Sequence, residues 1–65
     1  MGKEYTGSWS ANNGSTYNHG YTDTNKSRLA KDMRTICKGN VFAGNTGNWQ
    51  VCDDDNNVIL QGTCR

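Results

Sequence analysis

The chain has 65 residues, with 7 basic and 6 acidic side chains, and we expect one small domain over residues 1–65. Its net charge of +1 argues against duplex DNA as a partner, because general nucleic-acid binders carry a strong basic excess. Only 32% of the residues are hydrophobic, so we predict a thin core and expect a homo-oligomer to supply the missing stability.

The N-terminal third of the chain predicts a β-hairpin. Tyr5 and Trp9 alternate with small polar residues over residues 3–10, which is the period of a half-buried strand. Asn13-Gly14 follows, and this dipeptide favours a hairpin turn because both residues tolerate positive φ. A second alternation, which starts at residue 17, predicts the partner strand.

The middle of the chain predicts one helix. Asp23 or Thr24 is the expected N-cap, since either side chain can accept a hydrogen bond from an early backbone N–H. Gly39 is expected to end the helix in a left-handed conformation. Apolar residues recur at helical spacing and predict the buried face, which consists of Leu29, Met33, Ile36 and Cys37.

Residues 41–43 are expected to turn the chain back and close one end of the core. A second hairpin is predicted from strands at residues 49–53 and 58–64, joined by a turn rich in Asp and Asn. Pairing across this turn predicts a face toward the helix (Trp49, Val51, Val58 and Leu60) and an outer face (Gln50, Cys52, Ile59 and Gln61). The predicted fold class is α+β, a small ββαββ domain in which one helix packs on an antiparallel sheet.

The first turn of the predicted helix carries charges of the unfavourable sign. A helix N-terminus has a partial positive charge that acidic residues normally offset, yet Lys26 and Arg28 lie there. A bound anion would offset both charges, and the free N–H groups of a helix start bind phosphate. We therefore expect a ligand site made of this segment and of aromatic or imidazole rings that contact a base: Thr24, Asn25, Lys26, Ser27 and Arg28, with Trp9, Tyr17, His19 and Tyr21.

This site predicts a non-enzymatic binding protein that captures a small phosphorylated ligand, above all a nucleotide. The Asn- and Gly-rich residues 11–20 are expected to close over the ligand. In its brevity, its lack of proline and its richness in Asn, Gly and Thr, the chain resembles small phage-encoded proteins in a general way. The resemblance implies an anti-defence role, in which the protein sequesters a nucleotide immune signal of the host.

A second hypothesis is a protein-binding inhibitor of a host defence protein. Lys31, Arg34 and Lys38 recur at helical spacing beside Ser27 and form a basic ridge opposite the buried face. Such a ridge suits an acidic partner, and exposed Trp and Tyr side chains are the residues that dominate interface energetics.

No catalytic residue, cofactor or metal site is predicted. His19 is the only histidine and has no carboxylate neighbour in sequence, so we do not expect an enzyme. The turn at residues 53–57 resembles a calcium loop, but Val58 and Cys64 stand where that loop needs glycine and glutamate. The turn is therefore expected to be a solvated one.

Cys37, Cys52 and Cys64 are expected to be reduced and buried, because no apolar signal-peptide core follows Met1. A Cys52–Cys64 bridge is the alternative in an oxidising compartment. No segment approaches the ~20 apolar residues that span a bilayer, so no membrane partner is expected. The predicted location is the cytoplasm, which for a viral protein is that of the host cell.

Overall fold

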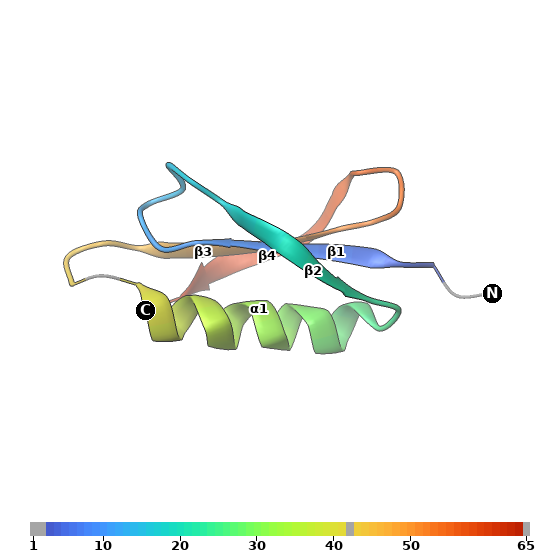
Figure 1. Ribbon diagram of the computed structural model, residues 1–65, viewed down its shortest axis with the longest axis horizontal. Coiled ribbons are helices and arrows are strands. Elements are labelled where there is room, and N and C mark those ends of the chain that lie inside the picture. Colours follow the sequence, from blue (N-terminus) through green and yellow to red (C-terminus); the bar gives the residue numbers. More distant parts are fainter. Residues whose placement is uncertain (1–2, 42, 65) are drawn as a thin grey trace.

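In a computed structural model of the protein, which describes residues 3–41 and 43–64, four antiparallel strands form one sheet. The strand order is β2-β1-β3-β4, and the helix α1 packs on one face of the sheet (Figure 1). This arrangement confirms the predicted α+β class. The elements are β1 (Tyr5–Ser10), β2 (Asn18–Asp23), α1 (Lys26–Asn40), β3 (Gly47–Cys52) and β4 (Val58–Cys64).

The sheet is twisted, as strands of L-residues usually are. The central strands β1 and β3 run along the helix, while the edge strands β2 and β4 cross it diagonally in opposite directions (Figure 1). Both hairpin connections therefore project on the side of the sheet that faces away from the helix. The helix α1 thus covers one face of the sheet, and the β1–β2 and β3–β4 connections rise at the two ends of the other face.

The core lies between the central strands and one face of the helix. Leu29, Met33 and Val51 are its buried members, and Met33 and Val51 have no exposed surface. The helix approaches β1 closely because Gly7 has no side chain, since a Cβ at that position would lie 2.6 Å from Met33 Sδ. The predicted helical face is confirmed, because Leu29, Met33 and Cys37 are buried on it.

The N-cap of the helix lies one residue after Thr24, the later of the two predicted caps. Asn25 is the N-cap, and its Oδ1 accepts the Arg28 N–H at 3.0 Å. Thr24 and Asp23 precede the cap, so the predicted capping role of either residue is wrong. Asn ranks with Asp among the best N-cap residues, which leaves the Asp23 carboxylate free for another partner.

The helix ends without a left-handed glycine. Gly39 lies inside α1 and lacks a positive φ, so its predicted role as the terminator is wrong. Asn40 is the last helical residue, and its Nδ2 donates to the Ile36 carbonyl at 2.7 Å, which satisfies one acceptor of the final turn. Of the segment predicted to close the core, Val41 is half-buried and Ala43 is exposed, while Phe42 lies outside the described residues. No helix of the described ranges has the length and apolar character needed to cross a membrane.

A β-bulge moves Val58 off the face that meets the helix. Val51 pairs with Leu60 and Cys52 pairs with Val58, so Ile59 is an extra residue on β4. Val58 is consequently 47% exposed, which corrects its predicted place on the covered face. Trp49, Val51 and Leu60 do pack into or against the core, as predicted.

Cys52 also differs from the prediction, because it is buried rather than facing outward or another subunit. It lies in a central strand, where it pairs with Thr6 of β1 and with Val58 of β4. Its thiol is free.

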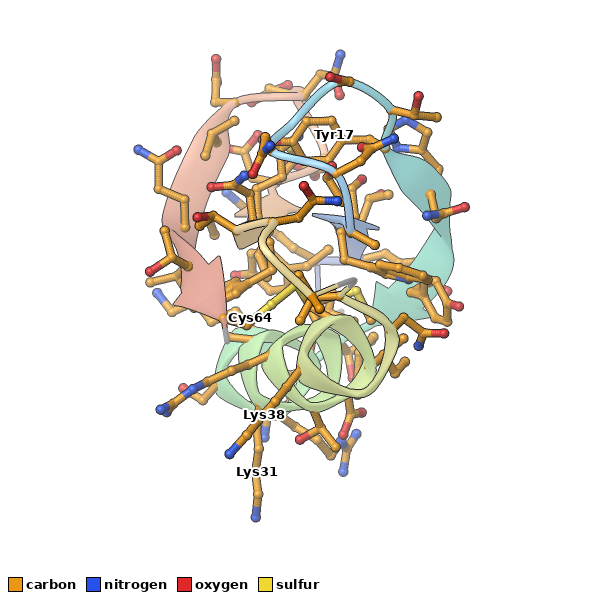
Figure 2. The ribbon with its side chains drawn as sticks, turned by 90° about the vertical axis from the view of Figure 1, so that its left-hand side faces the viewer. Tyr17, Lys31, Lys38 and Cys64 are labelled. Carbon is orange, nitrogen blue, oxygen red and sulfur yellow. A yellow bond between two sulfur atoms is a disulfide. The ribbon has the colours of Figure 1, made fainter. Side chains whose placement is uncertain are left out.

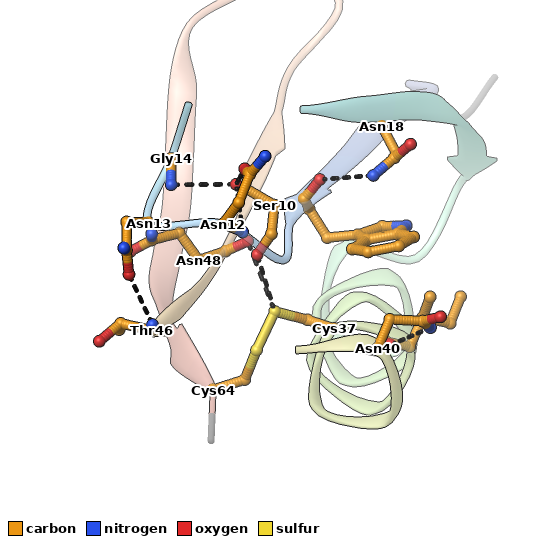
Figure 3. Close-up of a disulfide and its surroundings, with 12 residues drawn as sticks. Ser10, Asn12, Asn13, Gly14, Asn18, Cys37, Asn40, Thr46, Asn48 and Cys64 are labelled. Carbon is orange, nitrogen blue, oxygen red and sulfur yellow. Dashed lines mark hydrogen bonds between the residues drawn. A yellow bond between two sulfur atoms is a disulfide. The ribbon is translucent and has the colours of Figure 1, made fainter. Parts of the chain in front are cut away.

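The other two cysteines form a disulfide. Cys37 of α1 and Cys64 of β4 are bridged, with Cα atoms 6.2 Å apart, and the bond joins the last turns of the helix to the last strand (Figure 3). The expectation of three reduced thiols is therefore wrong for this pair, and the Cys52–Cys64 alternative is not formed. Gly47 leaves room for the bridge, because a Cβ there would clash with both sulfur atoms.

The connection between β1 and β2 is anchored at its predicted turn. Asn13 and Gly14 both have positive φ, of 63° and 85°. The Asn13 N–H donates to the Thr46 carbonyl at 3.0 Å, and Asn13 Oδ1 accepts the Thr46 N–H at 2.6 Å (Figure 3). The buried Ser10 hydroxyl accepts the Gly14 N–H at 3.0 Å. The two bonds between Asn13 and Thr46 tie the connection to the segment that leads into β3, and the Ser10 bond ties it to the end of β1.

Candidate functional site

One of the two cations at the start of the helix is paired with a carboxylate of the same chain. Lys26, Ser27 and Arg28 occupy the first turn as predicted, with no acidic residue among them. Arg28 nevertheless has a partner, because its Nε and one terminal guanidinium nitrogen each donate to the Asp23 carboxylate at 2.7 Å. Asp23 also accepts the Asn25 N–H at 3.0 Å. A carboxylate of the protein thus lies where a bound anion was expected.

This contact changes the acidity of both partners. The hydrogen bonds from Arg28, helped by the Asn25 N–H, lower the pKa of the Asp23 carboxyl well below its usual range. The same pair raises the pKa of Arg28. Asp23 is therefore ionised at neutral pH and offsets the partial positive charge of the helix N-terminus. Within the described ranges, Lys26 has no ion-pair partner and is exposed.

The rings of the predicted ligand site are not gathered at the helix start. Tyr17 lies on the side of the sheet opposite the helix (Figure 2), and its ring stacks on His19 with centroids 6.5 Å apart. Trp9 and Tyr21 pack against the core. Trp9 lines a pocket with Asn40, the last residue of the helix, so it belongs to the opposite end of α1. Of these four residues, Tyr21 alone is close in sequence to the Asp23–Arg28 pair.

A different set of cations gathers in one groove along the helix. Lys31, Arg34 and Lys38 line it at i, i+3 and i+7, a span of about 10 Å along the helix axis. Lys31 and Lys38 extend from the helix into solvent, away from the sheet (Figure 2). The groove has a volume of about 570 Å³ and is completed by Ala30, Thr35 and Trp49. We call Lys31, Arg34, Lys38 and Trp49 the basic groove.

The indole of the basic groove is held by a glycine on the neighbouring strand. Trp49 of β3 pairs with Gly62 of β4. A Cβ on Gly62 would lie 2.9 Å from the Trp49 ring, so the ring occupies the space that any other residue would fill. Trp49 is half-buried and packs against the core, which fixes its position beside the cations. Gly62 is thus a positioning residue for the groove.

In the described part of the chain, no acidic side chain lines the basic groove. Asp32, the aspartate of α1, lines a separate groove between the helix and β2, together with Tyr21. Among residues 3–41 and 43–64, the Asp23–Arg28 contact is the only ion pair, so the three groove cations have no carboxylate partner. Three like charges along one helix face repel one another, and a partner of negative charge relieves that repulsion.

Ser8 and His19 form a hydrogen bond that the sequence pattern did not reveal. Ser8 Oγ lies 2.6 Å from His19 Nδ1 across β1 and β2. Ser8 is only 2% exposed, so its hydroxyl is out of reach of a substrate. The contact anchors the imidazole on the edge strand, where His19 is exposed. The β1–β2 register, which contains a bulge, brings the two residues together.

The aspartate-rich turn is organised by hydrogen bonds to its first residue. Asp53 Oδ1 accepts the N–H groups of Asp55 at 3.0 Å and of Asn57 at 2.9 Å. These bonds lower the pKa of the Asp53 carboxyl, the Asn57 N–H being the main cause. One ligand atom from each of Asp53, Asp54 and Asp55 lies within 4.8 Å of the others. Such a cluster is common in solvated turns, and Asp53 is engaged in closing the turn.

Comparisons of the chain with protein-family models, with curated proteins and with solved structures find no match. The functional assignment therefore rests on the geometry of the sites. Trp49 of the basic groove and Gly62, which positions its ring, were not predicted as site residues. The alternation of β3 places Trp49 on the helix side, but only the register of β4 shows that Gly62 makes room for its ring.

Proposed function

We propose that this protein is a non-enzymatic binding module that contacts an acidic protein segment through the basic groove. The observation that carries the proposal is that Lys31, Arg34 and Lys38 line one groove with Trp49, and that among the described residues no carboxylate pairs with these three cations. Trp and Arg are the residues that contribute most at protein interfaces. The apolar ring and the charges together suit a segment in which acidic side chains flank an apolar one.

The capture of a phosphorylated ligand at the helix start stays a prediction. It was predicted from the unfavourable position of Lys26 and Arg28 at the positive end of the helix, which a bound anion would offset, but Asp23 already engages Arg28 through two hydrogen bonds of 2.7 Å. An incoming phosphate would have to displace this carboxylate, or bind at Lys26 alone. The host target, the anti-defence role and the homo-oligomer likewise stay predictions.

The disulfide favours an oxidising compartment over the cytoplasm that the sequence pattern predicted. Cys37 and Cys64 are bridged, and such bonds persist mainly in secreted, periplasmic or surface proteins. We propose that the acidic partner is met in such a compartment.

A direct test uses a fluorescein-labelled peptide in which a central leucine is flanked by glutamates. Fluorescence anisotropy should show saturable binding that weakens as salt is added. The double substitution Lys31→Glu with Arg34→Glu should abolish binding, whereas Lys26→Glu, a matched reversal outside the groove, should change it little.

Two arms separate this proposal from its competitors. A peptide with glutamines in place of glutamates should not bind. A single-stranded oligothymidylate and inorganic phosphate test the nucleic-acid and phosphate alternatives. The proposal is wrong if the acidic peptide does not bind, or if it binds the double variant and the native protein equally well.

A further inference from the structure

We propose a second binding site, for a neutral saccharide, in the pocket at the C-terminal end of the helix. This pocket has a volume of about 290 Å³, near the lower end of the range of small-molecule sites. It shares no residue with the basic groove, so the inference is independent of the proposed function. Its lining consists of Trp9, Ala11, Asn12, Thr16, Asn18 and Asn40.

Three carboxamides from different parts of the chain meet at this pocket. Asn12 belongs to the β1–β2 connection, Asn18 begins β2, and Asn40 ends the helix (Figure 3). Convergence of segments that are distant in sequence on one concave surface is typical of binding sites.

Each carboxamide uses one end to bond the protein and keeps the other end for a ligand. Asn12 Oδ1 accepts hydrogen bonds from the Ser10 hydroxyl at 2.9 Å and from the Thr16 N–H at 3.1 Å. Asn40 Nδ2 donates to the Ile36 carbonyl at 2.7 Å. These contacts fix the orientation of both amides. In the described part of the chain, Asn12 Nδ2 and Asn40 Oδ1 make no hydrogen bond.

Asn18 repeats this pattern. Its Nδ2 donates to the Trp9 carbonyl at 3.5 Å, a weak bond, and within residues 3–41 and 43–64 its Oδ1 has no donor. The pocket thus offers one amide nitrogen without a protein partner, Asn12 Nδ2, and two such amide oxygens, Asn18 Oδ1 and Asn40 Oδ1, while the Asn18 and Asn40 nitrogens each keep a second N–H. The Thr16 side chain adds a hydroxyl that can serve in either role.

The chemistry of the lining selects a neutral ligand with many hydroxyl groups. Among residues 3–41 and 43–64, no charged side chain lines the pocket, so an ionised ligand would lose hydration without gaining a counter-charge there. A hydroxyl group both donates and accepts, which matches amides that present both N–H donors and carbonyl acceptors. The half-buried Trp9 indole adds an apolar surface with a negative π face, which attracts the C–H groups of a sugar ring. Amides and an indole together therefore suit a saccharide.

The test is a titration of the ¹⁵N-labelled protein with a panel of neutral hexoses and their disaccharides, followed by ¹H–¹⁵N correlation spectra. At least one sugar should give saturable shifts of the side-chain amides of Asn12, Asn18 and Asn40 and of the Trp9 indole N–H. A nucleoside, adenosine, is titrated in parallel and should give no such shifts.

Two variants and one control localise the site. Asn40→Ala and Asn18→Ala should each weaken the binding of that sugar about fivefold, the effect of one hydrogen bond. Gln61→Ala removes an exposed carboxamide on β4 and should leave the affinity unchanged. Absence of a saturable shift with every sugar, equal affinity in all three variants, or binding of adenosine alone would each overturn the proposal.

Discussion

The Cys37–Cys64 disulfide should supply a large part of the stability of this domain. The bridge closes a loop with a sequence separation of 27 residues, and loop-closure entropy gives a stabilisation of about 3.5 kcal/mol for a loop of that length. A chain of 65 residues has a total free energy of unfolding of roughly 3–10 kcal/mol. Breaking the bridge should therefore remove at least a third of the total.

Urea denaturation with and without a reducing agent measures this contribution. With an m value of about 1 kcal/mol/M, typical of the smallest domains, reduction should lower the urea midpoint by about 3.5 M. The double variant Cys37→Ala with Cys64→Ala should resemble the reduced protein and should not respond to the reductant.

Cys52→Ala is the matched control, because Cys52 is a free, buried thiol outside the bridge. The urea midpoint of this variant should still fall by about 3.5 M on reduction. The reasoning is refuted if reduction shifts the midpoint of the native protein by less than about 1 M. It is also refuted if thiol titration of the denatured, unreduced protein detects all three cysteines instead of Cys52 alone.

The remaining predictions concern the helix and its contacts. Asn25→Ala should destabilise the protein by about 1 kcal/mol in urea denaturation, since it removes the N-cap acceptor of the Arg28 N–H. An unchanged urea midpoint would show that Asn25 does not cap the helix. Because the folded pKa of Asp23 is depressed, its stabilising contribution is complete above its unfolded pKa near 4 and is lost as the pH falls below that value. An Arg28→Met variant should therefore lose less stability than the native protein when acid titration is followed by circular dichroism between about pH 4 and pH 2, and parallel curves would contradict the ion pair. Gly39→Ala should raise the free energy of unfolding by about 0.5–1 kcal/mol, since residue 39 is helical and has open space around it. Gly7→Ala should lower that free energy by about 1–3 kcal/mol, because the new Cβ would overlap Met33, and a neutral result would show that Met33 can move aside.

The fold class could be predicted because the periodic signals are local. The helical spacing of Leu29, Met33 and Cys37 marks the buried face, and the Asn13-Gly14 turn appears with the expected positive φ values. Val58 could not be placed, because a single extra residue at Ile59 reverses the face of Val58, the first residue of the strand. Nothing in the periodicity of β4 reveals this bulge.

The sites were harder to predict because they depend on pairings between distant residues. The first helical turn carries cations and no acidic residue, as predicted. The counter-charge for Arg28 comes from the side chain of Asp23, two residues before the N-cap, which the sequence pattern did not reveal. The disulfide follows from the β3–β4 register, which places Cys64 beside Gly47 at the end of the helix. Lys31, Arg34 and Lys38 were recognised as a ridge, whereas the contribution of Trp49 needed the packing of β3 against the helix.

The most direct test of the basic groove is the emission of Trp49 itself. In a Trp9→Phe variant, Trp49 is the single tryptophan, and titration with the acidic leucine-containing peptide should change its emission in a saturable manner. Adding Arg34→Glu to this variant should abolish the change. Peptide binding that leaves the Trp49 emission constant, or an equal change in the presence of Arg34→Glu, would contradict the assignment of this groove as the partner surface.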